Sequence, residues 1–182
     1  MPKEPVALDK AHRLITNGPV TLVCSAYKDR VGIMPVSWVM PVSLKPLLVA
    51  IAINHKAFTH EMIEKSNEFS VNVPTGDLAR AVKQAGGISS RDVDKFKVIG
   101  LHPLAALKIK SPLVEECIGH LECGVIERLS PGDHTIFIAE VLAAQVEAGA
   151  FEGVWLVEKE EAKVLHHLGG STYCVPKGRF DV

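Results

Sequence analysis

Closely spaced runs of apolar and β-branched residues recur along most of the chain and predict a mainly β fold. The predicted strands cover residues 20–27, 33–42, 47–53, 69–73, 118–129, 134–146, 154–157 and 163–165. Polar turn signals separate them, such as Lys28-Asp29-Arg30 after the first strand and Ser130-Pro131-Gly132-Asp133 between the two longest. Closely spaced strands with few helices between them indicate an antiparallel barrel.

Three short helices are predicted between the strands. Asp9 can cap a helix that runs through Thr16, with its apolar side chains facing inward. A second helix covers residues 59–65, with Thr59 as its N-cap. A third ends at Gly86-Gly87, because apolar residues before that pair recur at i, i+3, i+4 and i+7. The inward apolar residues are Ala11, Leu14 and Ile15 in the first helix and Leu78, Ala81, Val82 and Ala85 in the third.

The predicted strand 134–146 is apolar on both faces. One face carries Phe137, Ala139 and Val141, and the other carries Ile136, Ile138 and Leu142. A barrel wall with one solvated face would alternate apolar with polar residues. We therefore expect one face to fill the barrel and the other to pack against a second subunit, which makes the protein a homodimer.

Length and charge limit the possible classes of protein. The 182 residues fit one domain spanning 1–182, and 20 Lys and Arg against 21 Asp and Glu leave no basic excess for nucleic acid or an anionic membrane. No apolar run approaches the roughly 20 residues of a membrane helix, and the N-terminus has no export signal. The four scattered cysteines are typical of a reduced, cytoplasmic protein.

Two familiar kinds of site are disfavoured. No glycine-rich dinucleotide fingerprint or P-loop is present, so a Rossmann or P-loop nucleotide site is not expected. Cys117, His120 and Cys123 suggest a metal site, but His120 points to the opposite face of a strand, and six residue steps separate the thiols by roughly 20 Å. We therefore predict no metal site, and expect the two cysteines to be small buried apolar residues.

The stretch 33–59 carries the first candidate binding site. Trp38 lies between Pro35 and Pro41, which cannot donate hydrogen bonds to a neighbouring strand. Backbone groups beside them are then free to form hydrogen bonds with a polar ring such as an isoalloxazine. An edge strand with a core tryptophan explains the pattern as well. Farther along, Ser43, Lys56 and Thr59 would suit the terminal phosphate of a mononucleotide. The alternative is ordinary helix capping beside a solvated lysine.

The segment 86–96 carries the second candidate. Two glycines and the hydroxyls of Ser89 and Ser90 precede Arg91 and Lys95, which would share one face of a short helix at i, i+4. These groups could contact a phosphate, ribityl hydroxyls or the pyrimidine edge of a flavin. A solvated charged loop is the alternative reading.

Taken in order, these motifs resemble the flavin reductase-like family, most closely its flavoredoxin branch. The resemblance runs from about Val20 to Tyr173, and each motif alone is weak while their order and spacing are specific. The matching segments are Ser37-Trp38-Val39-Met40-Pro41-Val42-Ser43, Lys56-Ala57-Phe58-Thr59, Ser89-Ser90-Arg91-Asp92-Val93-Asp94-Lys95-Phe96, Glu116-Cys117, Leu121-Glu122-Cys123, Gly132-Asp133-His134-Thr135-Ile136-Phe137, His167-Leu168-Gly169-Gly170 and Tyr173.

The resemblance implies a six-stranded antiparallel split β-barrel, the FMN-binding split barrel, with a few short peripheral helices and non-covalent FMN at a dimer interface. It implies catalytic roles for His134 and His167 near the reactive face of the flavin. The implied FMN contacts are Ser37, Trp38, Val39, Met40, Ser43, Lys56, Thr59, Ser89, Ser90, Arg91, Lys95 and Tyr173.

The implied activity is an NAD(P)H-dependent FMN oxidoreductase, with NAD(P)H as a transient co-substrate. Two alternatives remain open: a flavoredoxin-like electron carrier whose tightly bound FMN is reduced by a redox partner protein, and a split barrel that binds haem or a deazaflavin. The sequence also departs from the family pattern. Val31-Gly32-Ile33-Met34 offers no side-chain amide, and Ser90 stands where the family usually has glycine, which takes up positive φ more freely.

Overall fold

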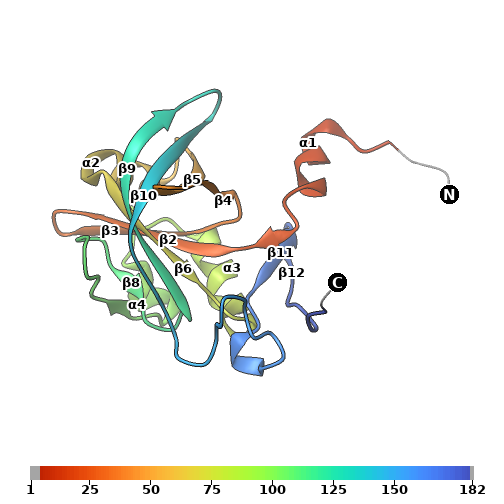
Figure 1. The fold of residues 1–182 in the computed structure, drawn as a ribbon. Coiled ribbons are helices and arrows are strands. Elements are labelled where there is room, and N and C mark those ends of the chain that lie inside the picture. The colour runs from red at the N-terminus through yellow and green to blue at the C-terminus, as the bar shows by residue number, and fades with distance from the viewer. Residues whose placement is uncertain (1–4, 181–182) are drawn as a thin grey trace.

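A computed structural model describes residues 5–180, and its centre is a strongly curled antiparallel sheet (Figure 1). The strand order is β3-β2-β6-β9-β10-β5-β4, so seven strands form one hydrogen-bonded sheet. Their bounds are β2 Thr21–Tyr27, β3 Arg30–Val36, β4 Val39–Leu44, β5 Leu47–Asn54, β6 Glu68–Val73, β9 Gly119–Leu129 and β10 His134–Val146. The mainly β prediction is confirmed, whereas the predicted number of six strands is not.

The sheet has two open edges, and the chain passes directly from one to the other. β3 is the first strand of the order and β4 the last, and within residues 5–180 they are not paired with each other. The single strand predicted over 33–42 is therefore wrong, because Ser37 and Trp38 break it. Pro35 and Pro41 lie in the two edge strands, where the missing N–H is tolerated. The two prolines therefore lie on either side of the gap between the unpaired edges β3 and β4, which we call the split.

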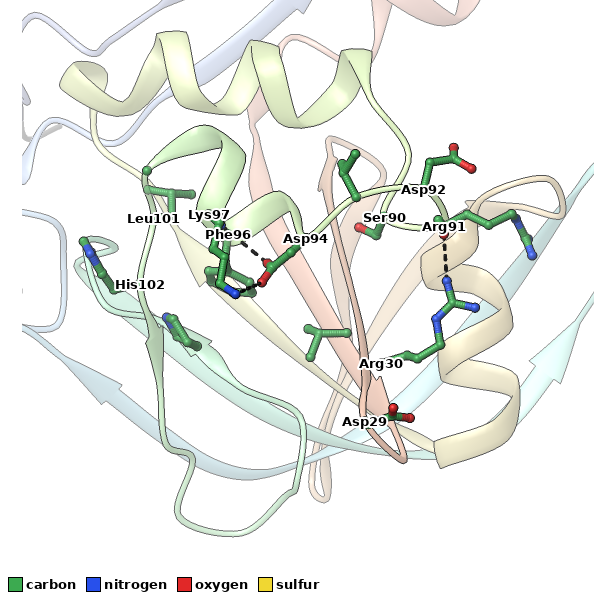
Figure 2. A pocket seen from close by; sticks show the side chains of 14 residues that line it. Asp29, Arg30, Ser90, Arg91, Asp92, Asp94, Phe96, Lys97, Leu101 and His102 are labelled. Atoms are coloured by element: carbon green, nitrogen blue, oxygen red, sulfur yellow. Dashed lines mark hydrogen bonds and ion pairs between the residues drawn. The ribbon is translucent and has the colours of Figure 1, made fainter.

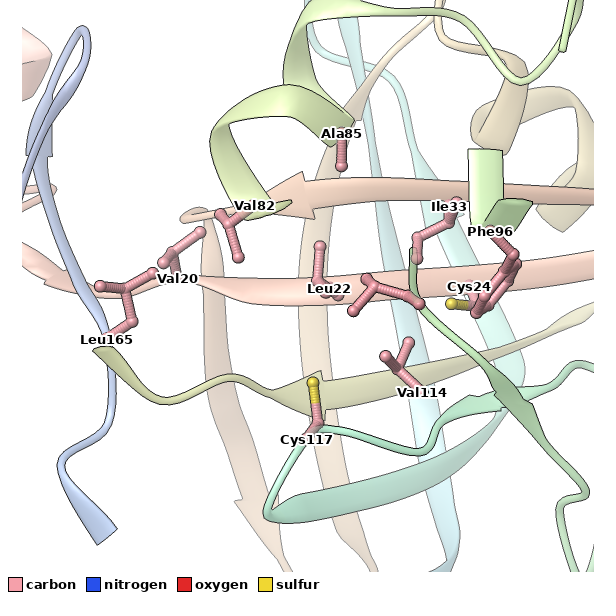
Figure 3. Packing of buried hydrophobic residues seen from close by; sticks show 11 residues of the cluster. Val20, Leu22, Cys24, Ile33, Val82, Ala85, Phe96, Val114, Cys117 and Leu165 are labelled. Atoms are coloured by element: carbon pink, nitrogen blue, oxygen red, sulfur yellow. The ribbon is translucent and has the colours of Figure 1, made fainter. Parts of the chain in front are cut away.

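Alternating residues of the curled sheet face two separate cores. On β2, Val23 packs inside the barrel with Phe69, Phe137 and Ile51. Its neighbours Leu22 and Cys24 point outward, against the α3 and α4 helices, and Figure 3 shows this outer cluster. The two cores explain why several strands are apolar on both faces.

Cys117 and Cys123 confirm the expectation of buried thiols and belong to different cores. Cys117 lies in the outer cluster, and Cys123 lies inside the barrel. Burial raises the pKa of Cys123 to about 12 and also raises that of Cys117, so both thiols stay protonated. They act as small apolar side chains.

Short helices cover the outside of the sheet. They are α1 Leu8–Ala11, α2 Phe58–Ser66, α3 Ala79–Gly87 and α4 Lys95–Ile99, with 3-10 turns η1 His12–Leu14, η2 Gly76–Leu78 and η3 Glu160–Ala162. The predicted helices at 59–65 and 78–87 are confirmed within a residue or two. Thr59 is not the N-cap of α2, since Ala57 holds that position and no side chain caps it.

The N-terminal helix differs from its prediction. Its N-cap is Ala7 rather than Asp9, and it ends after one turn. Leu14 and Ile15 are 65% and 85% exposed instead of facing inward. In Figure 1 the α1 helix lies apart from the curled sheet, and Ile15 borders a surface hollow beside Trp38 rather than a core.

The C-terminal third differs as well. The predicted strands 154–157 and 163–165 are mostly irregular in the structure, with isolated bridges only. Instead, β11 His166–Gly169 pairs with β1 Gly18–Pro19 and with β12 Thr172–Cys174 in a small three-stranded sheet. A two-stranded ribbon, β7 Pro103–Leu104 with β8 Leu113–Val114, precedes β9. Between residues 5 and 180, no helix is long and apolar enough to cross a bilayer.

Candidate functional site

Trp38 occupies the split between the two sheet edges and forms the wall of a cleft. Its carbonyl oxygen accepts a hydrogen bond of 3.0 Å from the backbone N–H of Ala52 on β5. The indole is 40% exposed, and the His134 ring lies against it with centroids 4.7 Å apart. This ring cleft has a volume of about 300 Å³, and its lining includes His12, Met34, Pro35, Ser37, Trp38, Ala52, Asn54, His134 and His167.

The orientation of His134 is fixed by its neighbour in the chain. His134 Nδ1 lies 2.6 Å from Asp133 Oδ1, so the ring donates from Nδ1 to the carboxylate and leaves Nε2 available. This hydrogen bond is the main reason that the pKa of Asp133 falls below its ordinary value. The Asn54 side-chain amide donates to the other carboxylate oxygen at 3.4 Å. The Asp133 carboxylate thereby holds two residues that line the cleft, His134 and Asn54.

His167 approaches the same cleft from β11. Its Nε2 lies 3.1 Å from the carbonyl oxygen of Gly170, which can only accept, so Nε2 carries a proton. When the ring is neutral, Nδ1 accepts from the hydroxyl of Ser37, 3.1 Å away. The Tyr173 ring stands beside His167, with centroids 5.1 Å apart. The structure therefore brings Ser37, Trp38, His134 and His167 to one cleft, with Tyr173 against its edge.

A second pocket adjoins the ring cleft and carries positive charge. It shares Met34 and Pro35 with the cleft and has a volume of about 350 Å³. Its lining contains Lys56 and Thr59, which were predicted near the phosphate, and Ser89, Ser90 and Lys95, which were predicted to contact the phosphate, the ribityl chain or the ring edge of the flavin. We call it the phosphate pocket. The cleft and the pocket adjoin at Met34 and Pro35, and we call the two together the depression, which has an aromatic end and a cationic end.

Thr59 reaches the phosphate pocket from the first turn of α2, where it is almost fully buried. The helix comes this close to β3 because Gly32 has no side chain: a Cβ there would lie 2.8 Å from Thr59 Oγ1. The backbone N–H of Lys56 donates to the Asn54 side chain at 3.0 Å, which fixes the turn between β5 and α2. Asn54 thus connects the two ends of the depression.

Lys95 is buried, with 6% of its surface exposed, and its ammonium group holds two backbone segments together. Nζ donates to the carbonyl oxygens of Ile33 at 2.8 Å and Ala85 at 2.6 Å. No carboxylate among residues 5–180 forms an ion pair with it. Burial lowers the pKa of Lys95 to about 8. The wall of the phosphate pocket therefore holds a cation without a counter-charge.

The predicted helix that joins Arg91 and Lys95 is wrong. α4 begins only at Lys95, and Arg91 belongs to an irregular segment before it. The Arg91 guanidinium lies 2.9 Å from Glu61 and over the Phe58 ring, and it lines a neighbouring groove rather than the phosphate pocket. Asp94 is the N-cap of α4, so Arg91 lies outside the helix. The i, i+4 spacing therefore does not place Arg91 and Lys95 on one helix face.

Ser90 fits its place without the conformational freedom of glycine. Its φ is not positive, and it is buried, with its hydroxyl accepting a 3.2 Å hydrogen bond from the N–H of Ile33. The neighbouring Ser89 hydroxyl is exposed and accepts from the N–H of Arg91 at 3.1 Å. The departure from the family pattern at Ser90 is thus compatible with the local backbone.

Ser43 is remote from the other predicted phosphate ligands. It pairs with Leu48 near the start of β5, whereas Lys56 follows the end of that strand. Eight residues of extended chain correspond to roughly 26 Å. Val39 and Met40 line a separate apolar hollow of about 550 Å³ that shares Ser37, Trp38 and Ala52 with the ring cleft. Ser43 and Lys56 therefore do not belong to one site within a single chain.

Two residues that line the cleft were not predicted from the sequence. His12 stands at an edge of Trp38 with ring centroids 6.0 Å apart, and Asn54 links the two ends of the depression. His12 lies in the segment that was predicted as a short helix with inward apolar side chains, and no binding role was predicted there. Asn54 is the last residue of the buried strand β5, and this position was the one available signal.

Comparisons with known proteins agree with this geometry. The family model described as "Flavin reductase like domain" matches residues 13–167. "Uncharacterized protein YddH" of Escherichia coli is 34% identical over 175 residues, which cover 93% of this chain and 92% of that one. A structure of an FMN-binding domain of a flavin reductases-like enzyme from Shewanella baltica has a TM-score of 0.83 at 25% identity, covering 97% of this chain and 95% of that one. Flavoredoxin of Desulfovibrio vulgaris has a TM-score of 0.86 at 23% identity, covering 100% and 96%.

Proposed function

Because the chain belongs to the flavin reductase-like domain family, we propose that it binds FMN without a covalent bond and acts as an NAD(P)H-dependent flavin oxidoreductase. One observation carries this proposal. The aromatic ring cleft and the cationic phosphate pocket adjoin at Met34 and Pro35, and their linings match the two chemical ends of a flavin mononucleotide.

The phosphate pocket fits the charged end of FMN. Lys95 is a buried cation that lacks a carboxylate partner among the described residues, and Lys56 lines the same pocket. An uncompensated buried charge is costly, and a bound phosphate would offset that cost. Lys56 and the Ser89 hydroxyl are free to contact the phosphate directly. Lys95 would act mainly through its charge, since two of its three N–H groups already hold backbone carbonyls.

The ring cleft fits the isoalloxazine. The flat faces of Trp38 and His134 border it, and Ser37 and Asn54 offer polar side-chain groups to the ring edge. Bound FMN would supply the hydride and electron chemistry, and the protein would orient and tune it. His134, held by Asp133 through Nδ1, keeps Nε2 available to hold or move a proton at the cleft. His167 orients Ser37 and closes the opposite wall.

We also propose that the protein works as a homodimer. On β10, Phe137 and Ala139 are buried in the barrel, which confirms the inward face. The opposite face of the same strand leaves Ile136 and Ile138 half-buried and Leu142 exposed. Met40, which is 58% exposed, lines the hollow next to Trp38 together with Ile136, and Ile138 and Leu142 extend this apolar surface along β10. A second copy would cover this surface and complete the ring cleft.

A second candidate function is that of an electron carrier. The Trp38 indole is 40% exposed at the mouth of the cleft, so a reducing protein could approach the flavin ring there without any nicotinamide site. In that case FMN would stay bound as a prosthetic group, and NAD(P)H would not reduce it.

The absorption spectrum of the purified protein tests both functions. We expect the bands of oxidised flavin, with FMN released on heating, and bleaching when NADH or NADPH is added without oxygen. Flavin bands that both nucleotides leave unchanged would support the carrier. A colourless protein that does not bind added FMN would contradict both functions.

A further inference from the structure

The N-terminal arm, which we define as residues 8–15, exposes most of its apolar side chains. Leu8, Leu14 and Ile15 are 91%, 65% and 85% exposed. His12, by contrast, lines the ring cleft and stands at the edge of the indole there. The arm is therefore anchored beside the proposed flavin site, while its apolar residues form a surface that a second molecule can cover.

The arm is also weakly basic. It contains Lys10 and Arg13 against a single acidic residue, Asp9. Neither of the two bases forms an ion pair within residues 5–180. Their positive charges are therefore available to the acidic groups of another molecule.

A groove of about 340 Å³ lies near the end of β10, whereas the ring cleft lies at the start of that strand. Val146 lines the groove together with the aromatic rings of Phe151 and Trp155, whose centroids are 5.3 Å apart. The Trp155 ring packs closely over Gly119, where a Cβ would lie 2.9 Å from it. Phe151 is 42% exposed and the neighbouring Val154 is 53% exposed. The groove is therefore an apolar surface that is open to solvent.

Negative charge borders this groove. The stretch 140–155 contains Glu140, Glu147 and Glu152 and no basic residue. All three glutamates are exposed, and none of them forms an ion pair in the part of the chain that the structure describes. Glu147 and Glu152 each directly follow a residue that lines the groove. We call it the acidic groove, and its charge is opposite to that of the arm.

An apolar surface connects the arm with the acidic groove. At one end, Ile15 lines the apolar hollow together with Met40. Ile138 and Leu142 extend this surface along β10, and Val146 then lines the acidic groove. The arm and the groove thus lie at opposite ends of the surface through which we propose that the homodimer forms.

The arm is too far from the acidic groove of its own chain to fill it. It lies beside the ring cleft, where His134 begins β10, and the groove lies at Val146, where β10 ends. Twelve residue steps of extended chain correspond to roughly 40 Å. In a dimer whose two-fold axis is perpendicular to β10, however, the start of one β10 lies beside the end of the other.

We propose that the N-terminal arm of each subunit docks into the acidic groove of a second copy of this chain. This rests on the proposed homodimer. The apolar side chains of the arm enter the groove, as an amphipathic helix does, and Lys10 and Arg13 face the glutamates at its border. Because the arm is anchored at the ring cleft, the segment 147–155 of the second copy then stands beside that cleft and helps to close it.

Sedimentation velocity measures the dissociation constant of the dimer. Leu14→Asp places a carboxylate on the arm, and Phe151→Asp places one in the groove. We expect each variant to weaken the dimer at least tenfold, and the double variant to be no weaker than the weaker single one, since both remove the same contact. Val93→Asp is the matched control and should stay within twofold, because Val93 is 41% exposed but lines the separate groove beside α4 (Figure 2).

Zero-length cross-linking identifies the contact directly. A carbodiimide joins an amine to a carboxylate that touches it, and a mixture of ¹⁴N-labelled and ¹⁵N-labelled protein distinguishes links between chains from links within one chain. We expect mixed-isotope peptides that join Lys10 to Glu147 or Glu152. A dimer without such links, whose dissociation constant is also unchanged in Leu14→Asp and Phe151→Asp, would overturn the docking of the arm.

Met40→Asp separates this inference from the proposals on which it rests. If Met40→Asp dissociates the dimer while the arm and groove variants do not, the homodimer is supported and the docking of the arm is wrong. A wild type that is monomeric at every concentration would refute both. A wild type that dimerises through the arm but does not bind FMN would refute the proposed flavin chemistry alone. Circular dichroism equal to that of the wild type shows that each variant is folded.

Discussion

The His134 imidazole packs against the Trp38 indole at a centroid distance of 4.7 Å, although 96 positions of sequence separate them. Trp38 lies where the chain crosses between the two edges of the sheet, and His134 is the first residue of β10. Their contact forms the aromatic end of the candidate site. The two residues meet because Trp38 lies beside Ala52 of β5, and β5 pairs with β10.

Replacing Trp38 tests the aromatic end. Trp38→Ala should weaken FMN binding about tenfold, because stacking of aromatic rings contributes roughly 0.5–1.5 kcal/mol beyond the buried area. Quenching of flavin fluorescence on titration measures the affinity. Leu44→Ala is a suitable control, since Leu44 is 82% exposed at the far end of β4. An unchanged affinity in Trp38→Ala would place the isoalloxazine elsewhere.

Replacing Lys56 tests the cationic end. Lys56→Gln should weaken FMN binding more than tenfold, because a charge-assisted contact is worth about 1.5–3 kcal/mol. Riboflavin, which has no phosphate, should bind the variant and the wild type equally. Lys45→Gln, on the exposed turn between β4 and β5, should leave both affinities unchanged. If riboflavin loses as much affinity as FMN, Lys56 does not act on the phosphate.

The buried ammonium of Lys95 should make stability depend on pH in the alkaline range. Its pKa of about 8 in the folded protein lies below its ordinary value of 10.5, so the unfolded chain binds more protons between these two values. The free energy of unfolding of the flavin-free protein should therefore rise from pH 8 to pH 10.5, by up to about 1.4 kcal/mol per pH unit from this group.

Urea titrations across that range, on the wild type and on Lys95→Met, measure the effect. The variant should lack this part of the slope, and bound FMN should flatten the slope of the wild type, because a phosphate favours the charged lysine. Parallel pH profiles for the two flavin-free proteins would show that Lys95 is not desolvated.

Gly32 tests the contact that positions α2. Gly32→Ala would place a Cβ 2.8 Å from Thr59 Oγ1 and 2.9 Å from the backbone Cα of Thr59. Because the backbone cannot rotate away, we expect a loss of about 1–3 kcal/mol in stability and weaker FMN binding. Thermal unfolding measures the first effect. Gly87→Ala, with nothing within 4 Å of its Cβ, is the control and should not destabilise. Equal melting temperatures for the two variants would contradict this account.

Local sequence patterns were sufficient for most elements of the fold. Apolar runs and turn residues located β2, β5, β6, β9 and β10 within a residue or two, because strand formation and turns depend on neighbouring side chains. The order of weak motifs identified the family, and Lys56, Thr59, Ser89 and Lys95, which were predicted as flavin contacts, line one pocket. The short C-terminal strands β11 and β12 were missed, since their pairing with β1 depends on residues about 150 positions away.

Only the tertiary structure decided which residues share a site. Pro35 and Pro41 indicate edge strands, yet nothing local shows that they mark opposite edges of one sheet, so the break at Ser37 and Trp38 was not predicted. Strand register, a long-range property, separates Ser43 from Lys56. Likewise, the helix boundary at Asp94 sends Arg91 and Lys95 to different cavities. The sequence alone determined which chemical groups are available, and the curl and register of the sheet determined which of them meet.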